Sequence, residues 1–366
     1  MRVLVVNAGS SSLKLRLLDA ADTIERSADL PAGADGLDTS RLAGVLQDWP
    51  GPDVVGHRIV HGGTAFTGPV RIDNAVRQQL ADLTDLAPLH QPKSLAALDA
   101  VTAQLPGVAA VASFDTAFHA SIPAAAATYA VPREWRERYA IRRYGFHGLS
   151  HAYCSRRAAE LAGRPAAGLR VITCHLGAGA SLAAVLDGRS VDTTMGFTPL
   201  EGLVMATRSG TVDPGLVLWL EEHEHLSPHQ VSTALESRSG LLALAGTGDM
   251  REVEAAADRG EPDARLAIDV YIHRLAGGIA AMSAATEGVD VLAFTGGVSE
   301  HSALVRRRAA GRLAYLGVAI DPGRNDAVSG DADITAAGAS VRTLVITARE
   351  DLQIAGEARR LLAGLR

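Results

Sequence analysis

The sequence has few of the features that mark secreted, membrane-spanning or nucleic-acid-binding proteins. Its 366 residues include only two cysteines, Cys154 and Cys174, whose spacing fits neither a disulfide framework nor a zinc motif. No apolar run is long enough to cross a bilayer, and Asn7 interrupts the run at the N-terminus, so no signal peptide is expected. The net charge of −6 and the absence of a long basic run argue against binding to nucleic acid or to a membrane surface. We therefore expect a cytoplasmic protein.

The composition is that of an ordinary globular protein. Hydrophobic residues make up 47% of the chain and charged residues 21%, which is far from the balance of disordered chains. A chain of this length is long for one core and suits two domains. The Ala/Gly/Asp-rich stretch from Ala28 to Ser40 is expected to be an ordinary surface excursion.

The first informative segment is VLVVNAGSSSLKLRLLD, from Val3 to Asp19. The run from Val3 to Val6 is typical of a buried strand, and the run from Leu13 to Leu18 alternates apolar with basic residues, as a half-exposed strand does. The turn between them has more hydroxyl groups than a connection needs. Glycine and serine let backbone N–H groups approach an anion, so the turn predicts a phosphate-binding site.

A second segment repeats this pattern. RVITCHLGAGASLAAVLDG, which begins at Arg170, follows the first segment at an offset of 168 positions, so that Gly9 corresponds to Gly177 and Asp19 to Asp187. Both segments predict a strand, a glycine-rich turn and a second strand. Internal similarity of this kind indicates a duplicated unit.

The remaining pattern alternates strands with helices, which favours a mixed α/β fold. VDVLAFTGGVSEHSALVRRRAAGRL predicts a strand, a turn at Gly296 and Gly297, and a helix, which is a second natural site for a nucleotide. The arginines from Arg306 to Arg308 are expected on a solvated helix face.

Three long motifs occur together and in order: NAGSSSLK, YGFHGLSH and TPLEGLVMATRSG. With these motifs the chain resembles the acetate kinase (acetokinase) family of the actin-like/sugar-kinase superfamily. The resemblance implies an α/β fold of two duplicated actin-like (ribonuclease H-like) domains around a nucleotide cleft, and a homodimer. The N-terminal domain would comprise residues 1–118 plus 352–366, and the C-terminal domain residues 119–351.

The resemblance also implies an activity and its residues. The reaction is the reversible transfer of the γ-phosphoryl group of ATP to acetate, which gives acetyl phosphate and ADP and depends on Mg²⁺, with Mn²⁺ as an alternative. The implied catalytic residues are Asp115, His147 and Arg208, and the implied metal ligands are Asn7 and Glu350. The implied acetate-binding residues are Arg58, Val60, Leu89, Phe146 and Pro199. The implied nucleotide-binding residues are Ser10, Ser12, Lys14, His175, Leu176, Gly177, Ala178, Gly179, Asp249, Met250, Arg251, Gly297, Val298, Ser299, Glu300 and His301.

The chemistry of these residue types agrees with the implied reaction. A carboxylate acceptor is already ionised at neutral pH and needs capture rather than a general base, and the planar fork of Arg58 suits a carboxylate. Cationic side chains such as Arg208 stabilise the charge on the transferring phosphoryl group. Asp115 is interpreted as orienting cations rather than accepting a proton.

The sequence departs from the family pattern at three places, all on the nucleotide side. Ala178 replaces an asparagine, Ser299 and His301 replace a glycine and an asparagine, and Ala348-Arg349 replaces Thr-Asn before Glu350. We therefore expect the acceptor to be better specified than the nucleotide.

Two alternatives stay open at this point. The chain is either an acetate kinase or a propionate or short-chain carboxylate kinase with another phosphoryl donor. The non-enzymatic alternative is an actin-like nucleotide-switch or filament protein, although such a protein does not need an arginine-lined acceptor site.

Overall fold

The computed structural model describes residues 1–9, 12–33, 36–87 and 91–364. The chain divides into two compact units. Unit 1 comprises Met1–Ala120, Phe146–Tyr153 and Arg349–Arg366, and unit 2 comprises Ser121–Gly145 and Cys154–Ala348. The segment Phe146–Tyr153, expected in the C-terminal domain, therefore clusters with the N-terminal one.

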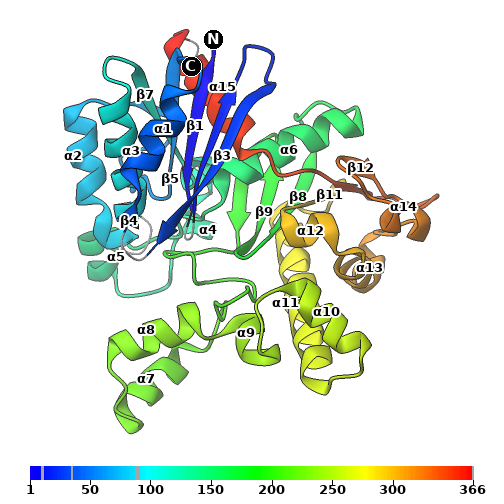
Figure 1. Cartoon of the computed structure of the whole chain (residues 1–366). Coiled ribbons are helices and arrows are strands. Elements are labelled where there is room, and N and C mark those ends of the chain that lie inside the picture. The colour runs from blue at the N-terminus through cyan, green and yellow to red at the C-terminus, as the bar shows by residue number, and fades with distance from the viewer. Residues whose placement is uncertain (10–11, 34–35, 88–90, 365–366) are drawn as a thin grey trace. The chain divides into compact units, whose positions relative to one another are not determined.

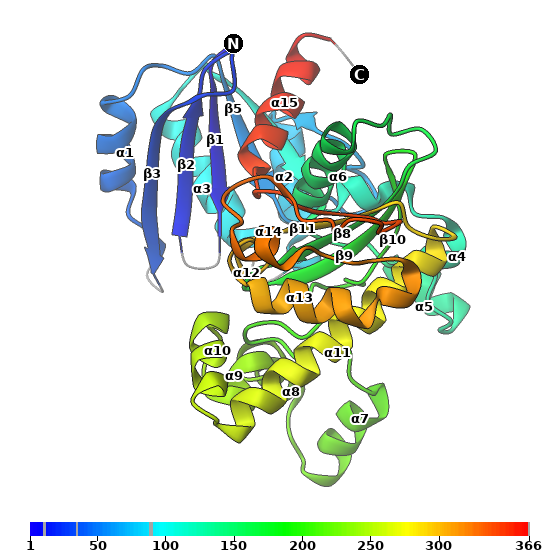
Figure 2. The ribbon, with the colours of Figure 1, turned by 90° about the vertical axis from the view of Figure 1, so that its right-hand side faces the viewer.

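Unit 1 is built on a seven-stranded sheet with the order β4-β3-β2-β1-β5-β7-β6. Figure 2 shows β3, β2, β1 and β5 side by side in this order. The hairpin expected at the N-terminus is formed by β1 and β2, and β1, β5 and β7 run parallel. The strands are β1 (Val3–Ala8), β2 (Ser12–Leu18), β3 (Ile24–Gly33), β4 (Gly36–Leu37), β5 (Val54–Ile59), β6 (Val70–Arg71) and β7 (Ala109–Phe114).

Helices cover both faces of this sheet. One core joins Leu4, Leu13 and Leu15 to residues of α1 (Thr39–Gln47) and α3 (Gln91–Gln104). The core on the other face joins Val3, Val5 and Val54 to the C-terminal helix and to Leu149 at the start of α6. The remaining helices are α2 (Asn74–Asp82), η1 (Thr84–Leu86), η2 (Ala117–Ser121) and α15 (Glu350–Leu362).

Unit 2 repeats this topology, which confirms the duplication. Its six-stranded sheet has the order β10-β9-β8-β11-β13-β12. The β8–β9 hairpin corresponds to β1–β2, and the parallel strands β8, β11 and β13 correspond to β1, β5 and β7. The strands are β8 (Arg170–Leu176), β9 (Ala180–Leu186), β10 (Arg189–Thr193), β11 (Val291–Thr295), β12 (Ala332–Asp333) and β13 (Arg342–Val345).

The long helix α11 (Pro262–Ala285) packs on β9, and α9 (Gly240–Ala245) and α10 (Met250–Asp258) pack against α11 (Figure 1). No helix of the described residues is both long and apolar enough to cross a membrane. The other helices are α4 (Ala124–Ala127), α5 (Arg133–Tyr139), α6 (Gly148–Ala162), α7 (Pro214–His223), α8 (Pro228–Ser237), α12 (Gly297–His301), α13 (Ala303–Arg312), η3 (Ala314–Leu316) and α14 (Pro322–Asp326).

Two expectations from the sequence are wrong. The stretch from Ala28 to Ser40, expected as a surface excursion, begins inside the sheet, because β3 pairs with β2 and Asp29 forms an ion pair with Arg16 on that strand. Because β3 lies near the sheet edge and is rich in polar residues, its sequence pattern did not indicate a strand. Arg306 is not on a solvated face either, because it is buried against carbonyl groups.

Gly56 lies where α15 approaches β5 most closely. A Cβ atom at Gly56 would lie 2.6 Å from Cγ2 of Ile354. Glycine within a strand commonly marks such a close approach, and here it lets the C-terminal helix pack on the sheet.

We expect Gly56→Ala to lower the free energy of unfolding by about 1–3 kcal/mol, because the added methyl group overpacks the core. Urea unfolding measures the change. The control is Gly44→Ala in α1, where nothing lies within 4 Å of the added atom and the substitution is expected to be neutral or slightly stabilising. Equal effects of the two substitutions would contradict the packing argument.

Candidate active site

The carboxyl ends of the parallel strands in unit 1 carry a charged cluster. Asn7 lies near the end of β1, Arg58 near the end of β5, and Asp115 follows β7. The carboxyl ends of parallel strands meet at one edge of a sheet, which is where α/β proteins place their ligands. Glu350 joins them as the first residue of α15.

The four side chains form one continuous network. Nη2 of Arg58 donates to Oδ2 of Asp115 at 2.6 Å, and Nε of Arg58 lies 3.1 Å from both carboxylate oxygens. Nη1 of Arg58 donates to Oδ1 of Asn7 at 3.0 Å. Nδ2 of Asn7 in turn donates to Oε2 of Glu350 at 3.0 Å. Arg58 therefore links the ends of three strands to the C-terminal helix.

Burial makes this network strongly interacting. The side chain of Arg58 is 16% exposed and that of Asp115 only 2%. Burial by itself would lower the pKa of Arg58, but Asp115 and Glu350 raise it above its usual value, so the guanidinium stays charged. Burial raises the pKa of Asp115, and the charge of Arg58 opposes that shift.

The segment around His147 packs against this network. The N–H of Gly148 donates to the carbonyl oxygen of Asp115 at 2.8 Å, and a Cβ atom at Gly148 would lie 2.1 Å from that oxygen. His147 precedes it with a φ of 57°. The carbonyl oxygen of Phe146 lies 3.0 Å from Nε2 of His119, which is fully buried. The glycine thus allows the start of α6 to contact the end of β7.

The other residues expected to bind acetate or phosphate in unit 1 differ in how buried they are. Val60 and Phe146 are buried in unit 1. Lys14 is exposed and pairs with Asn7 across the hairpin, and the carbonyl oxygen of Ser12 accepts a hydrogen bond from Gly9. Ser10 and Leu89 lie outside the described residues.

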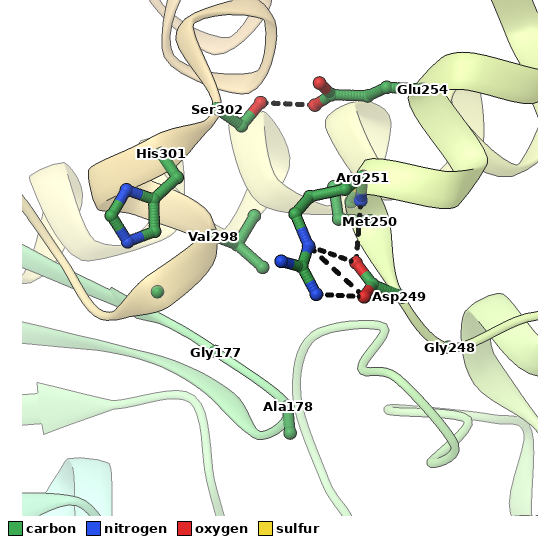
Figure 3. Close-up of a pocket in the computed structure, with 11 residues that line it drawn as sticks. Gly177, Ala178, Gly248, Asp249, Met250, Arg251, Glu254, Val298, His301 and Ser302 are labelled. Atoms are coloured by element: carbon green, nitrogen blue, oxygen red, sulfur yellow. Dashed lines mark hydrogen bonds and ion pairs between the residues drawn. The ribbon is translucent and has the colours of Figure 1, made fainter.

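The corresponding strand ends in unit 2 border a pocket of about 420 Å³ (Figure 3). Gly177 and Ala178 follow β8, and Gly297 and Val298 follow β11. The pocket is lined by Gly177, Ala178, Gly248, Asp249, Met250, Arg251, Glu254, Gly297, Val298, His301 and Ser302.

Half of the residues expected at a nucleotide line this pocket, and the side chains of Ser299 and Glu300 make contacts elsewhere. Oγ of Ser299 donates to the carbonyl oxygen of Cys174 at 3.3 Å. Oε1 of Glu300 accepts hydrogen bonds from the N–H groups of Gly296 and Ala348, at 3.0 and 2.9 Å. Both side chains therefore hold the α12 segment in place. His175, Leu176 and Gly179 lie beside the pocket, in or directly after β8.

Gly248, Glu254 and Ser302 also line the pocket, although the sequence pattern did not indicate them. Ser302 donates a hydrogen bond to Glu254, which joins α10 to the start of α13 across the pocket wall. Glu254 lies one turn after Arg251 in α10, and this helical spacing is the sequence signal that places it on the same side of the helix.

The wall formed by α10 carries an ion pair. Asp249 is the N-cap residue of α10, and its carboxylate binds Arg251 with an Nη2 to Oδ2 distance of 2.5 Å. In Figure 3 this pair faces Val298 and His301. The side chain of Arg251 is largely exposed, so it remains accessible to a ligand.

Arg208 and Pro199 both lie in unit 2. Arg208 is partly buried, and burial lowers its pKa from the usual value. Pro199 lies in a segment that a polar network anchors. Nη1 of Arg143 donates to the carbonyl oxygens of Thr194 and Met195 at 3.2 and 3.0 Å, and its Nη2 donates to Glu201 at 2.7 Å.

Tyr129 completes this network. Its hydroxyl donates to Glu201 and accepts from the N–H of Phe197 at 3.0 Å. A Cβ atom at Gly196 would lie 1.8 Å from Oε2 of Glu201 and 2.1 Å from the hydroxyl of Tyr129, so a larger residue would displace this hydrogen-bonded pair. The network thus fixes the segment that carries Pro199.

The two units provide complementary chemistry. The unit 1 cluster combines a guanidinium with carboxylate and amide oxygens, which can bind an anion and contribute ligands to a hard cation. No group of three His, Cys, Asp or Glu side chains in the described ranges is arranged to hold a metal ion. The unit 2 pocket offers glycine backbone at strand ends, as phosphate sites do.

Comparisons with known proteins agree over nearly the whole chain. The model of the acetokinase family matches residues 44–356. An acetate kinase of Gloeobacter violaceus is 44% identical over 399 aligned positions, which cover 98% of each chain. An acetate kinase of Clavibacter sepedonicus is 44% identical and covers 96% of this chain and 97% of its own.

Solved structures give the same result. The acetate kinase of Porphyromonas gingivalis superimposes with a TM-score of 0.90 at 35% identity and covers 99% of both chains. A propionate kinase of Francisella tularensis gives a TM-score of 0.91 at 34% identity, and covers 98% of this chain and 99% of its own. These matches confirm the predicted fold class.

We expect Glu201→Gln to lower the free energy of unfolding by about 2 kcal/mol, because Arg143 and Tyr129 lose a charged partner in a half-buried network. Urea unfolding at neutral pH measures this change in the free energy of unfolding. The control is Glu137→Gln, which breaks an exposed ion pair with Arg133 and is expected to cost less than about 0.5 kcal/mol. Similar losses in both variants would show that the network does not anchor the segment.

Proposed function

The chain belongs to the acetokinase family, and from this premise we propose that it transfers the γ-phosphoryl group of ATP reversibly to acetate. A carboxylate oxygen of acetate forms a bond to the γ-phosphorus, and the bond to the bridging oxygen of ADP breaks. The products are acetyl phosphate and ADP. The observation that carries the proposal is the buried network of Asn7, Arg58, Asp115 and Glu350.

The hydrogen bonds of Arg58 support its role as the carboxylate binder. Its contacts with Asp115 and Asn7 use three of its five N–H groups, which leaves two that no described residue occupies. Asp115 thereby orients the guanidinium, and it has no need to act as a base because acetate is ionised at neutral pH. Arg208 and His147 are the residues that stabilise the charge of the transferring phosphoryl group.

Asn7 and Glu350 are proposed as ligands of Mg²⁺, with Mn²⁺ as an alternative. Their side chains are in contact, and amide and carboxylate oxygens are the donors that such a hard cation prefers. When bound, the cation would neutralise phosphate charge. Ser12 and Lys14, at the start of β2, are proposed to contact phosphate, and Ser10, which lies outside the described residues, is proposed with them.

ATP is proposed to occupy the unit 2 pocket. Gly177 and Gly297 offer backbone close to phosphates, and Asp249 and Arg251 are suited to ribose hydroxyls and to the base or phosphate. Ala178 has no amide side chain to donate, and a lost hydrogen bond to a charged group costs about 1.5–3 kcal/mol. ATP affinity is therefore expected to be weaker than an asparagine at this position would give.

A propionate or short-chain carboxylate kinase is the second candidate. It is favoured by the 34% identity to the propionate kinase of Francisella tularensis. Val60 and Phe146 are buried side chains that suit a methyl group. Leu89 and Pro199 are proposed to contact the acyl group as well. A small apolar pocket discriminates weakly, since one methylene is worth about 1–3 kcal/mol.

The decisive experiment is a hydroxamate assay with acetate, propionate and butyrate, crossed with ATP, GTP and pyrophosphate. We expect the highest kcat/KM with acetate and ATP and a lower value with propionate. Arg58→Ala should mainly raise the KM for acetate, and Arg208→Ala should mainly lower kcat.

The control for these variants is Arg133→Ala, which removes an exposed arginine of α5 and should leave both constants unchanged. No acyl phosphate from any acid would refute the proposed function. A higher kcat/KM for propionate would favour the second candidate, and unchanged kinetics in both site variants would move the site elsewhere.

We also propose that the chain forms a homodimer, and we retain the cytoplasmic location as a prediction from the sequence. Leu216, Leu218 and Trp219 of α7 are exposed apolar side chains that a second copy could cover. Sedimentation velocity should give a dimer, and Leu216→Glu with Trp219→Glu should dissociate it if α7 lies in the interface. A monomer at micromolar concentration would contradict the dimer, and nucleotide-dependent filaments would favour the actin-like switch.

A further inference from the structure

Arg306 is a buried arginine whose partners are neutral oxygens. Its side chain is 1% exposed although its neighbours in α13, Arg307 and Arg308, are at the surface. Nη1 donates to the carbonyl oxygens of Ser299 and Glu300 at 2.6 and 3.0 Å. These two carbonyls belong to α12, next to its C-terminal end.

The other side of the guanidinium is held by one residue, Asn325 in α14. Nε donates to Oδ1 of Asn325 at 2.7 Å, and Nη2 donates to its carbonyl oxygen at 2.6 Å. Nδ2 of Asn325 donates to the carbonyl oxygen of Ala303 at 3.0 Å. Arg306 therefore connects α12 to α14, and Asn325 connects α14 to the start of α13.

Burial of the Arg306 guanidinium destabilises the folded state unless the side chain also holds another segment in place. In the part of the chain that the structure describes, Arg306 forms no ion pair with a carboxylate, and burial lowers its pKa. A buried charge is tolerated only where its hydrogen bonds are satisfied, and an apolar side chain would avoid the desolvation penalty. The positive charge is, however, favourable beside the C-terminal carbonyls of a helix.

The remaining contacts of α12 also hold this helix in place. Ser299 binds the carbonyl of Cys174 in β8, and Glu300 binds the N–H groups of Gly296 and Ala348. These side chains point away from the pocket, whereas Gly297, Val298 and His301 of the same short helix line it. A helix of five residues has little stability of its own, so its position depends on these anchors.

We propose that Arg306 is a positioning residue that fixes α12 so that Gly297, Val298 and His301 form one wall of the nucleotide pocket. This inference rests on the proposed function only in that the ligand is a nucleotide. Arg306 does not touch the ligand; it acts through the carbonyl groups of Ser299 and Glu300. Its planar fork reaches acceptors on both sides, which the ammonium group of a lysine does not.

The test compares Arg306→Lys and Arg306→Met with the matched controls Arg307→Lys and Arg307→Met. Arg307 lies on the next position of α13 with a half-exposed side chain, so it undergoes the same chemical change without loss of the carbonyl contacts. The dissociation constant for fluorescent N-methylanthraniloyl-ADP, measured by titration, should rise about tenfold or more in the Arg306 variants. In the Arg307 variants it should change less than twofold.

A second measurement separates positioning from general stability. Hydrogen exchange of the amides of residues 297–301 should accelerate in Arg306→Lys, while the amides of β8 and β11 keep their protection. If Arg306→Met does not fold, Arg306→Lys decides. A lowered melting temperature with unchanged nucleotide affinity and unchanged exchange in α12 would overturn the inference.

The outcome is distinguishable from failure of the proposed function. Nucleotide binding and hydrogen exchange are read without acetate, so they do not depend on which acid is the acceptor. Failure of the unmodified chain to bind the fluorescent nucleotide would count against the proposed function. Binding that Arg306→Lys leaves intact would count against the role of Arg306 alone.

Discussion

The contact between Arg58 and Asp115 is the constraint on which the rest of unit 1 depends. A guanidinium that is 16% exposed needs a counter-charge, and the 2.6 Å contact with Asp115 supplies it. The same guanidinium fixes Asn7, which in turn fixes Glu350. The ends of β1, β5 and β7 and the start of α15 are thus joined by one polar network, although the residues are up to 343 positions apart in the sequence. Removal of any member takes at least one hydrogen bond from a neighbour in the network.

Duplication explains why the two candidate sites lie at equivalent places. The hairpins β1–β2 and β8–β9 begin the same strand order, and each is followed by two parallel strands. In unit 1 the strand ends carry charged side chains, and in unit 2 they carry glycines that border a pocket. The same backbone topology therefore carries the cluster proposed to bind an anion in one copy and the pocket proposed to enclose the nucleotide in the other. A phosphoryl transfer needs both, since one group must be held rigidly while another must be accommodated by shape.

The sequence predicted local features well, because their causes are local. The two glycine-rich hairpins, and the strand, turn and helix around Gly296 and Gly297, each follow from a pattern within one short segment of the sequence. It failed where the cause was tertiary. Arg306 has the same sequence surroundings as Arg307, and only the carbonyl groups of α12 and Asn325 distinguish them. The strand β3 is polar because it lies near a sheet edge, and Ser299 points at Cys174 rather than into the pocket. These contacts join different elements of the fold, so the periodicity of a single helix or strand does not reveal them.

The two buried arginines show how the same side chain can serve opposite purposes. Arg58 pairs with a carboxylate and keeps two N–H groups that no described residue occupies, so it is suited to bind a further anion. Within the described residues Arg306 forms no ion pair, although the charges of Asp326 and Glu254 act on it, and carbonyl and amide oxygens occupy four of its five N–H groups. A guanidinium whose donors are nearly all satisfied by the protein has little left for a ligand, so its charge acts on the backbone instead. The number of donors still available, rather than burial or charge, separates an arginine that binds from an arginine that positions.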